Sequence, residues 1–203
     1  MEFQGASFQN LGNWLLRLAK LDLSVFDDVK DDVSATVPTL TVAVVASFLS
    51  GLGSWLWWTL EDLPDGGEVF IKSTILGSIF QVGVWFLWVY IAAMILSKGL
   101  RVPADMNRLL RTMALAFAPM SIAFLMLIAF LAIPIGAIAV GATFLLSYAA
   151  LQAATDAEPH QVALANLVGF VVFAVVLGIL SNISEVYESG GLAPGLFFFN
   201  LES

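Results

Sequence analysis

The chain has no cysteine among its 203 residues, which excludes disulfides, thiolate metal sites, cysteine nucleophiles and lipidated cysteines. Charged side chains are also scarce, at 12% of the sequence. The single histidine, His160, follows Pro159 in a polar loop. We interpret it as a solvated loop residue, with a pigment or haem ligand as the alternative. The sequence also lacks the common hydrolase, metalloprotease and phosphate-binding motifs. We therefore expect no enzyme activity, no metal and no cofactor.

Hydrophobic residues make up 60% of the chain, and the mean hydropathy is +0.92. A membrane-spanning helix needs about 20 apolar residues, because the hydrocarbon core is about 30 Å thick and each residue rises about 1.5 Å. The sequence therefore predicts an all-α integral membrane protein, a bundle of five transmembrane helices within residues 37–183. Residues 1–36 and 184–203 are predicted to be short tails. The five apolar stretches are Thr39–Trp58, Ile75–Leu96, Met113–Ile133, Ile135–Ala153 and Val162–Ile183.

Basic residues are distributed unevenly between the ends of these stretches. Lysine and arginine stay preferentially on the cytoplasmic side of a membrane, so we expect a cytoplasmic N-terminus and residues 184–203 outside. The net charge of −8 comes without a basic face, and we expect no nucleic-acid partner. The predicted cytoplasmic residues are Arg17, Lys20, Lys30, Lys98, Arg101, Arg108 and Arg111, against Lys72 alone on the other side.

Residues 8–20 have apolar and polar side chains on opposite sides of a helix. This pattern predicts an amphipathic helix at the membrane interface, with Trp14, Arg17 and Lys20 in the headgroup region. The alternative is that the same apolar side packs on the rest of the protein. That side consists of Phe8, Leu11, Trp14, Leu15 and Leu18.

Four aspartates, Asp27, Asp28, Asp31 and Asp32, would share one face of a helix near Lys30. Carboxylates so placed are able to bind a hard cation. We favour a solvated acidic turn, because no glycine-containing calcium loop or terminal glutamate accompanies them.

The first apolar stretch has small residues at helical spacing, which predicts close approach of another helix. In the second stretch Gly77 and Gln81 lie one helical turn apart. We expect an interhelical hydrogen bond for the buried Gln81, with a ligand contact as the alternative. The residues predicted to pack helices are Ala43, Ala46, Ser47, Ser50, Gly51, Ser54, Gly77 and Gln81.

The basic cluster Lys98, Arg101, Arg108 and Arg111 is predicted to lie at the membrane interface. Within it, residues 104–112 are expected to form a surface helix that leads into the third span, with Met106, Leu109 and Leu110 facing lipid or protein. Pro119 is expected to kink the third span. The turn between spans three and four is predicted at Pro134 and Gly136.

The final residues, GLAPGLFFFNLES, include an apolar run from Leu196 to Phe199 that is too short to span. A position at the outer interface, docking on a partner and packing on the chain's own helices stay open as interpretations.

Several segments resemble the Yip domain of Ypt/Rab-interacting membrane proteins and their prokaryotic relatives. They are VWFLWVYIAAMILSKGL, RLLRTMALAFAPMSIAFLMLIAFLAIPIGAIAV and LLSYAALQAATDAEPHQVALANLVG, with the upstream KLDLSVFDDVKDDVSAT similar to bacterial members. The resemblance implies five helices, a cytoplasmic N-terminus, an opposite C-terminus and a prokaryotic cytoplasmic membrane. Eukaryotic members act in vesicle trafficking with small GTPases, but the long cytoplasmic tail often seen there is nearly absent here. The family supplies no catalytic residue.

Two functional hypotheses follow. The first is a non-enzymatic membrane protein that acts by association, as a scaffold, assembly factor or accessory subunit of a larger complex. Its partners would be membrane lipids and other integral membrane proteins or a second copy. The second is a lipid-handling or membrane-shaping protein, suggested by two interfacial helices and by the breaks at Pro119 and Pro134.

Overall fold

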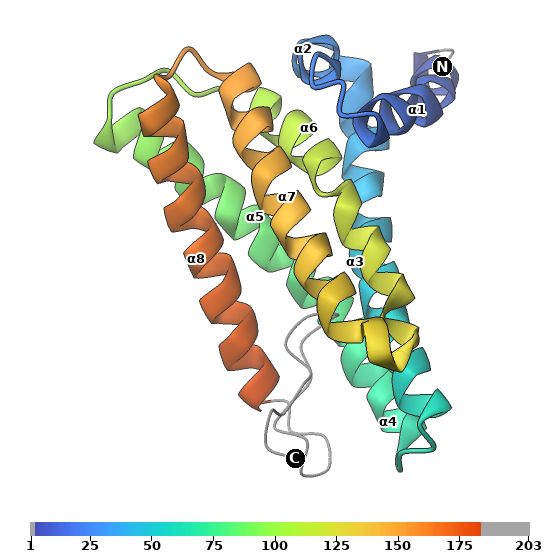
Figure 1. Ribbon diagram of the computed structural model, residues 1–203. Helices are drawn as coiled ribbons and strands as arrows, with labels where there is room; N and C mark the ends of the chain where they lie inside the picture. The colour runs from blue at the N-terminus through green and yellow to red at the C-terminus, as the bar shows by residue number, and fades with distance from the viewer. Residues whose placement is uncertain (1–2, 184–203) are drawn as a thin grey trace. The chain divides into compact units, whose positions relative to one another are not determined.

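The computed structural model describes residues 3–183, so the predicted tail at 184–203 and its apolar run lie outside the described residues. Residues 3–183 are helical almost throughout and contain no strand (Figure 1). The prediction of an all-α chain is confirmed. Among these residues, five helical segments are long and apolar enough to cross a membrane, which confirms the predicted number. They are Val33–Leu60, Gly66–Gly99, Met106–Leu127, Ala129–Ala154 and Pro159–Ser181.

The chain forms two compact units, and the boundaries between them fall inside the long helices. Unit 1 comprises residues 1–43, 88–118 and 144–170. Unit 2 comprises residues 44–87, 119–143 and 171–203. The helices shared by both units are α3 (Thr36–Leu60), α5 (Ser78–Met94), α7 (Ala132–Ala154) and α8 (Pro159–Ile183).

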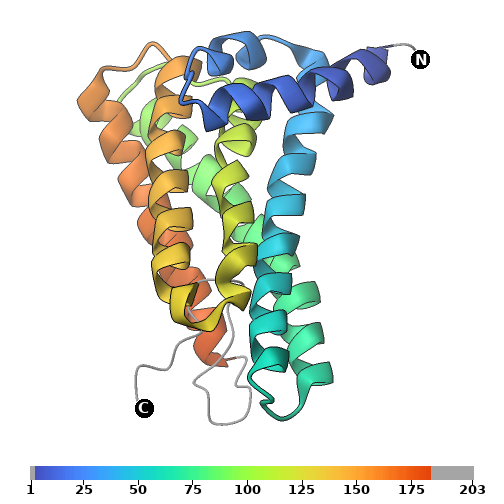
Figure 2. The same ribbon diagram turned by 45° about the vertical axis from the view of Figure 1, so that its right-hand side comes forward.

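Unit 1 begins with two helices that lie crosswise to the start of α3, as Figures 1 and 2 show for α1. These are α1 (Phe3–Ala19) and α2 (Val25–Lys30), followed by the 3₁₀ turn η1 (Val33–Ala35). The helix α2 packs on α6 (Met106–Ala116), while α1 contacts η1 and α2. Val25, Phe26 and Val29 of α2 are fully buried. The N-terminal segment is therefore an integral part of unit 1.

The interior of unit 1 contains a close contact between α5 and α8. A Cβ placed on Gly169 would lie 2.2 Å from Trp88 Cδ1, so only glycine accommodates the indole there. Phe170 meets Trp88 edge-on at 5.3 Å between ring centroids, and Phe144 at 4.9 Å. Aromatic pairs at these distances add to the stabilisation from burial.

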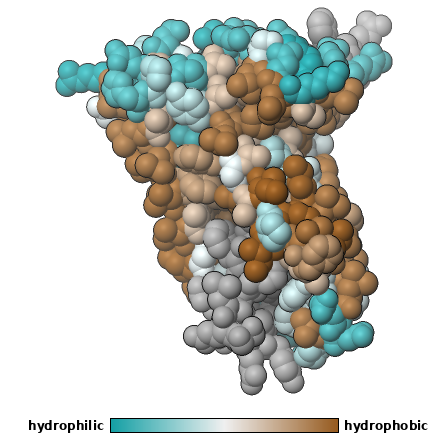
Figure 3. Space-filling model, in the orientation of Figure 1, coloured by the Kyte–Doolittle hydropathy of each residue, from teal (hydrophilic) through white to brown (hydrophobic). Residues whose placement is uncertain are grey.

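In Figure 3, hydrophilic side chains gather over α1, α2 and the loop between α7 and α8, whereas hydrophobic ones cover the flank of α8.

Unit 2 is organised around α3 and the helix beside it, which begins with α4 (Gly66–Val69) and the π-helical segment η2 (Phe70–Gly77). Figures 1 and 2 show α3 and α4 joined by a tight turn. A Cβ on Gly51 would lie 2.6 Å from the Ser73 carbonyl oxygen. A Cβ on Gly53 would lie 2.7 Å from the Ala123 carbonyl oxygen in the 3₁₀ segment η4 (Ala118–Leu127). Two glycines of α3 thus permit backbone contact with two neighbours.

One prediction about helix interruptions needs correction. The turn between spans three and four was expected at Pro134 and Gly136, but the helix breaks at Ile128, where the backbone is extended (φ −89°, ψ 101°). Pro134 lies in the first turn of α7, where its missing N–H has no intrahelical partner to lose. Near Pro119, where a kink is expected, the α-helix α6 ends at Ala116 and the chain continues in tighter 3₁₀ winding over Ala118–Leu127.

Residues 104–112 are predicted to form a surface helix that leads into the third span, with Leu109 facing lipid or protein. The helix α6 begins at Met106, where Asp105 accepts hydrogen bonds from the N–H groups of Asn107 and Arg108. It is not confined to the surface, since Leu109 and Met113 are fully buried. It is the first part of the third apolar segment, Met106–Leu127.

Candidate functional site

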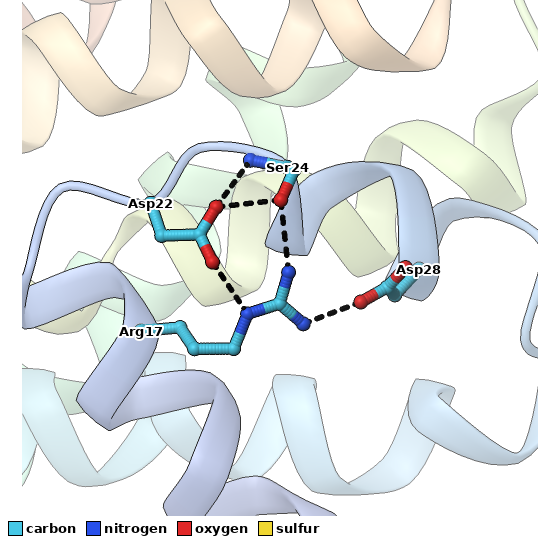
Figure 4. Close-up of polar contacts among 4 residues, drawn as sticks. All are labelled: Arg17, Asp22, Ser24 and Asp28. Carbon is cyan, nitrogen blue, oxygen red and sulfur yellow. Dashed lines mark hydrogen bonds and ion pairs between the residues drawn. The ribbon is translucent and has the colours of Figure 1, made fainter.

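The corner between α1 and α2 contains a polar network centred on Arg17 (Figure 4). Arg17 Nε donates to Asp22 Oδ2 at 2.7 Å, and Nη2 donates to Ser24 Oγ at 2.9 Å. Arg17 Nη1 forms an ion pair with Asp28. Ser24 in turn donates its hydroxyl and its backbone N–H to Asp22 Oδ1. Because each of the three guanidinium nitrogens has its own partner, the network fixes α1 against the start of α2.

The same network determines the protonation of Asp22. The hydrogen bonds from Ser24, and next those from Arg17, hold the pKa of the Asp22 carboxyl below its ordinary value of 3.8. Asp22 and Asp28 are 43% and 54% exposed. The ion pairs are therefore solvent-screened and set the position of α1 more than the overall stability.

The four aspartates weighed as a cation site are divided among different partners. Asp27 pairs with Lys30 at 2.7 Å, Asp28 pairs with Arg17, and Asp31 pairs with Arg108 at 2.7 Å. Asp32 accepts from the hydroxyl and the N–H of Ser34. Across residues 3–183, no three His, Asp or Glu side chains are grouped to hold a metal ion.

The structure divides the predicted basic cluster into two kinds of residue. Arg111 is only 6% exposed, and its guanidinium donates to the Lys30 carbonyl and, at 3.4 Å, to Thr36 Oγ1. Arg108 forms an ion pair with Asp31. Lys98 and Arg101 are exposed and have no acidic partner among the described residues. The buried position of Arg111 could not be predicted from the sequence, since the partner carbonyl lies 81 residues away.

Some side chains on the apolar side of α1 pack on the protein, and others are exposed. Trp14 and Leu18 are buried within unit 1, at 5% and 4% exposure. Leu11 and Leu15 are half-buried, and Phe8 is 45% exposed. For Trp14 and Leu18 the structure favours packing on the protein, the alternative to a membrane-surface contact.

All eight residues predicted to pack helices are buried. Those in unit 2 build a hydroxyl-rich seam between α3 and the η2–α5 helix. Ser73 Oγ donates to the Gly51 carbonyl at 2.9 Å, and Thr74 Oγ1 donates to the same oxygen at 3.3 Å. Ser78 Oγ donates to the Ser47 carbonyl at 3.2 Å. The small residues of α3 are thus occupied by contacts inside the chain.

Gln81 contradicts the prediction of an interhelical hydrogen bond. Its side chain is fully buried, and both amide atoms lack a hydrogen-bond partner. The neighbouring hydroxyl of Ser78 is already bonded to carbonyls. A buried amide without partners costs about 1–3 kcal/mol.

A shallow groove of about 370 Å³ opens between the outer flanks of α3 and the η2–α5 helix. Its two hydroxyl groups, on Thr74 and Ser78, donate to backbone carbonyls inside the seam. An occupant would therefore find only van der Waals contacts. The lining residues are Val44, Phe48, Thr74, Ile75, Ser78, Ile79 and Val82.

Two tryptophans that the sequence places near a helix end have structural partners. The indole N–H of Trp55 donates to the Gly66 carbonyl at 2.9 Å, and that of Trp58 donates to the Pro64 carbonyl at 2.6 Å. Both bonds close the turn after α3. Asp62 and Asp65 in this turn have left-handed backbone, which aspartate tolerates better than most residues.

His160 lies in the first turn of α8 and not in the predicted loop, although it is exposed as expected; its Nδ1 lies 3.3 Å from Glu158 Oε2. No protein-family model, curated protein or solved structure matches the chain. The Yip-domain resemblance therefore stays a proposal.

Proposed function

We propose that the chain is a five-span integral membrane protein of the Yip type, non-enzymatic, which acts by association with other membrane proteins. In this proposal it serves as a scaffold, assembly factor or accessory subunit. The observation that carries the membrane part is the inverted polarity of unit 2. Ser47, Ser50 and Ser73 are buried, whereas large apolar side chains are exposed, among them Val44, Val45, Phe48, Ile75, Ile79, Phe130 and Ile133.

This arrangement is the reverse of what water favours. Exposed apolar area of this extent in water would drive aggregation, whereas lipid tails are as apolar as the side chains that face them. Conversely, the buried hydroxyls of Ser73, Thr74 and Ser78 donate to backbone carbonyls, which suits a surrounding that offers no hydrogen bonds. The uneven distribution of lysine and arginine supports a cytoplasmic N-terminus.

Association is supported by the hydrophilic part of unit 1. The segment of α1 and α2 is fixed by Arg17 and Arg111 and exposes leucines outside the apolar spans, at Leu16, Leu21 and Leu23. In this proposal these exposed leucines contact the partner.

Insertion and orientation are tested with single cysteines, for which the cysteine-free chain is a ready background. Asn10→Cys should react with a membrane-impermeant maleimide only after the cells are permeabilised. Glu61→Cys, in the turn after α3, should react in intact cells. Equal reactivity at both positions, or release of the protein from membranes by carbonate, would refute the proposal.

Association is tested by gentle detergent extraction from native membranes, native gel separation and mass spectrometry. We expect stoichiometric co-migration with a defined membrane complex. A protein that migrates alone as a monomer, and whose deletion leaves every membrane complex unchanged, would contradict association.

The groove of unit 2 favours lipid handling as a second candidate. Its lining offers only van der Waals contacts, which suits an acyl chain. Reconstituted protein would then accelerate lipid exchange between the leaflets of liposomes, and Ile79→Trp, at the groove, should slow it. Exchange equal to that of protein-free liposomes counts against this candidate.

A further inference from the structure

The end of the second apolar segment has an unusual backbone. The helix closes in a π-helical turn, η3 (Ile95–Gly99), where the Leu100 N–H donates to the Ile95 carbonyl at 2.8 Å and the Val102 N–H to the Leu96 carbonyl at 2.9 Å. Between them Arg101 has left-handed backbone, with φ 58°. This position after a helix end usually holds glycine, because a Cβ in the left-handed region lies too close to the following carbonyl oxygen. An arginine is therefore retained at an energetic cost.

Arg101 and nearby Lys98 also lack the polar partners that most other basic residues of unit 1 have. Arg17, Lys30 and Arg108 form ion pairs, and Arg111 is bonded to a carbonyl and a hydroxyl. Among the described residues of unit 1, Lys20 is the one other exposed cation that has no acidic partner. The nearest carboxylate in sequence, Asp105, accepts hydrogen bonds at the start of α6. Two positive charges are thus available to an external anion.

The helix that leads to these charges is apolar on its exposed side. Tyr90 and Met94 are exposed at helical spacing, four residues apart, and Lys98 follows four residues later. An anion held at Lys98 and Arg101 would therefore have an apolar surface beside it, at Met94 and Tyr90. The ligand chemistry that fits both features is an anionic headgroup with an attached acyl chain.

We propose that Lys98 and Arg101 bind the phosphate headgroup of an anionic phospholipid, with an acyl chain along Met94 and Tyr90. This inference rests on the membrane insertion proposed above. The strained backbone at Arg101 is then explained by the need for its charge. Glycine would relieve the strain but would also remove the charge that binds the headgroup. Arg108 and Arg111, which the sequence groups with these two residues, take no part in this site.

The test uses the purified full-length protein in a neutral detergent and measures the shift of its thermal unfolding temperature. Dioleoyl phosphatidylglycerol is the probe, dioleoyl phosphatidylcholine is the neutral control and glycerol 3-phosphate is the headgroup without chains. A ligand that binds the folded state raises the unfolding temperature. We expect a shift with phosphatidylglycerol only. An equal shift with phosphatidylcholine, or with glycerol 3-phosphate at the same concentration, would overturn the assignment.

Three variants locate the site. With Lys98→Gln/Arg101→Gln we expect the apparent affinity for phosphatidylglycerol to fall about 30-fold, since each basic residue near an anionic surface contributes about 1 kcal/mol. Lys20→Gln removes the other unpaired cation and should leave the affinity unchanged. A double variant with the affinity of the unmodified chain, or an equal loss in Lys20→Gln, would overturn the proposal.

Arg101→Gly separates binding from structure. It should unfold at the same or a higher temperature without lipid, because glycine accepts φ 58° at no steric cost, and yet lose most of the shift. A lower unfolding temperature together with a full shift would show that Arg101 is structural. Failure of this inference is distinct from failure of the proposed function, since protein that resists carbonate extraction but shows no lipid preference contradicts only the headgroup site.

Discussion

The N-terminal corner of unit 1 and the seam of unit 2, between α3 and the η2–α5 helix, are both held by polar side chains. The chemistry of the two regions differs. In the corner, Arg17 binds carboxylates that are about half exposed. In the seam, the fully buried hydroxyls of Ser73 and Thr74 donate to one backbone carbonyl. Charges are retained where water reaches them, because desolvation would cost more than the pairing returns. Hydroxyls serve where water is excluded, because each needs only one acceptor.

The difference also concerns how closely the helices approach. Ion pairs hold α1 and α2 through long side chains and tolerate small displacements. The seam depends on backbone contact at Gly51, where a Cβ would lie 2.6 Å from the Ser73 carbonyl oxygen and 3.0 Å from Thr74 Cα. We therefore expect the seam to be the more sensitive of the two regions to mutation.

Gly51→Val should have the largest effect. Its new side chain meets backbone atoms that cannot move without separating the helices, so we expect a loss of about 3 kcal/mol, near the top of the range for overpacking. Denaturant titration of the detergent-solubilised protein, followed by circular dichroism, measures it. Gly83→Val is the matched control, since a Cβ there meets nothing within 4 Å. Equal stabilities of the two variants would contradict the assignment of the seam.

Whether a feature of these two regions can be predicted from the sequence depends on how far apart the interacting residues lie in the chain. The small residues at 43–54 are readable because their spacing follows the helical period, and the structure buries them. The five long apolar helices are readable because their length reflects a physical thickness. Proline positions were less informative, since Pro134 is equally compatible with a turn and with the first turn of a helix.

Long-range partners could not be read from the sequence. Arg111 and Arg108 look alike in one basic cluster, yet the first is buried against the Lys30 carbonyl and the second makes a surface ion pair. Gln81 illustrates the opposite error, because a polar residue in an apolar stretch suggests a partner that the neighbouring helix does not provide. Both outcomes depend on which carbonyls and side chains tertiary packing brings near, and helical period does not encode this.

Arg111→Gln should have the second largest effect and extends the comparison to a buried cation in unit 1. The change removes charge-assisted donation to the Lys30 carbonyl, which is worth about 2 kcal/mol for a hydrogen bond to a charged group. The same denaturant titration measures the loss. Arg108→Gln, which breaks an exposed ion pair with Asp31, should cost less than about 1 kcal/mol. A larger loss for Arg108→Gln would show that the ion pair, and not the buried donor, fixes α6.

Gln81→Met should stabilise the protein by about 1 kcal/mol, because it replaces a buried amide without partners by an apolar side chain of similar shape. Asn166→Leu should stabilise less, because it also removes the bond from Asn166 Nδ2 to the Phe144 carbonyl at 3.0 Å, while only Asn166 Oδ1 lacks a partner. The pair of variants is compared in one unfolding assay. Destabilisation by Gln81→Met would mean that the amide has a partner in the membrane, such as a bound lipid or a second protein.

The smallest effect is expected when the N-terminal corner of unit 1 is perturbed through Asp22. It should be measurable as a change in the protection of α1 amides from hydrogen exchange. The pKa of Asp22 is lowered in the folded protein, so its contribution is present above the unfolded-state value of about 3.8 and is lost as the pH falls through the folded-state value. Hydrogen exchange of α1 amides, corrected for the intrinsic pH dependence, should therefore accelerate below about pH 3.8. Asp22→Asn should show weaker protection of α1 at pH 7 and less change in acid.

The seam is the internal control for that measurement, because its hydrogen bonds join hydroxyls to carbonyls and have no titratable group. Its exchange should not respond to acid over the same range. Raising the salt concentration to about 1 M shortens the Debye length to about 3 Å and should loosen α1 while leaving the seam unchanged. If α1 and the seam lost protection together, the corner would not be an independent electrostatic contact, and its opening would be part of global unfolding.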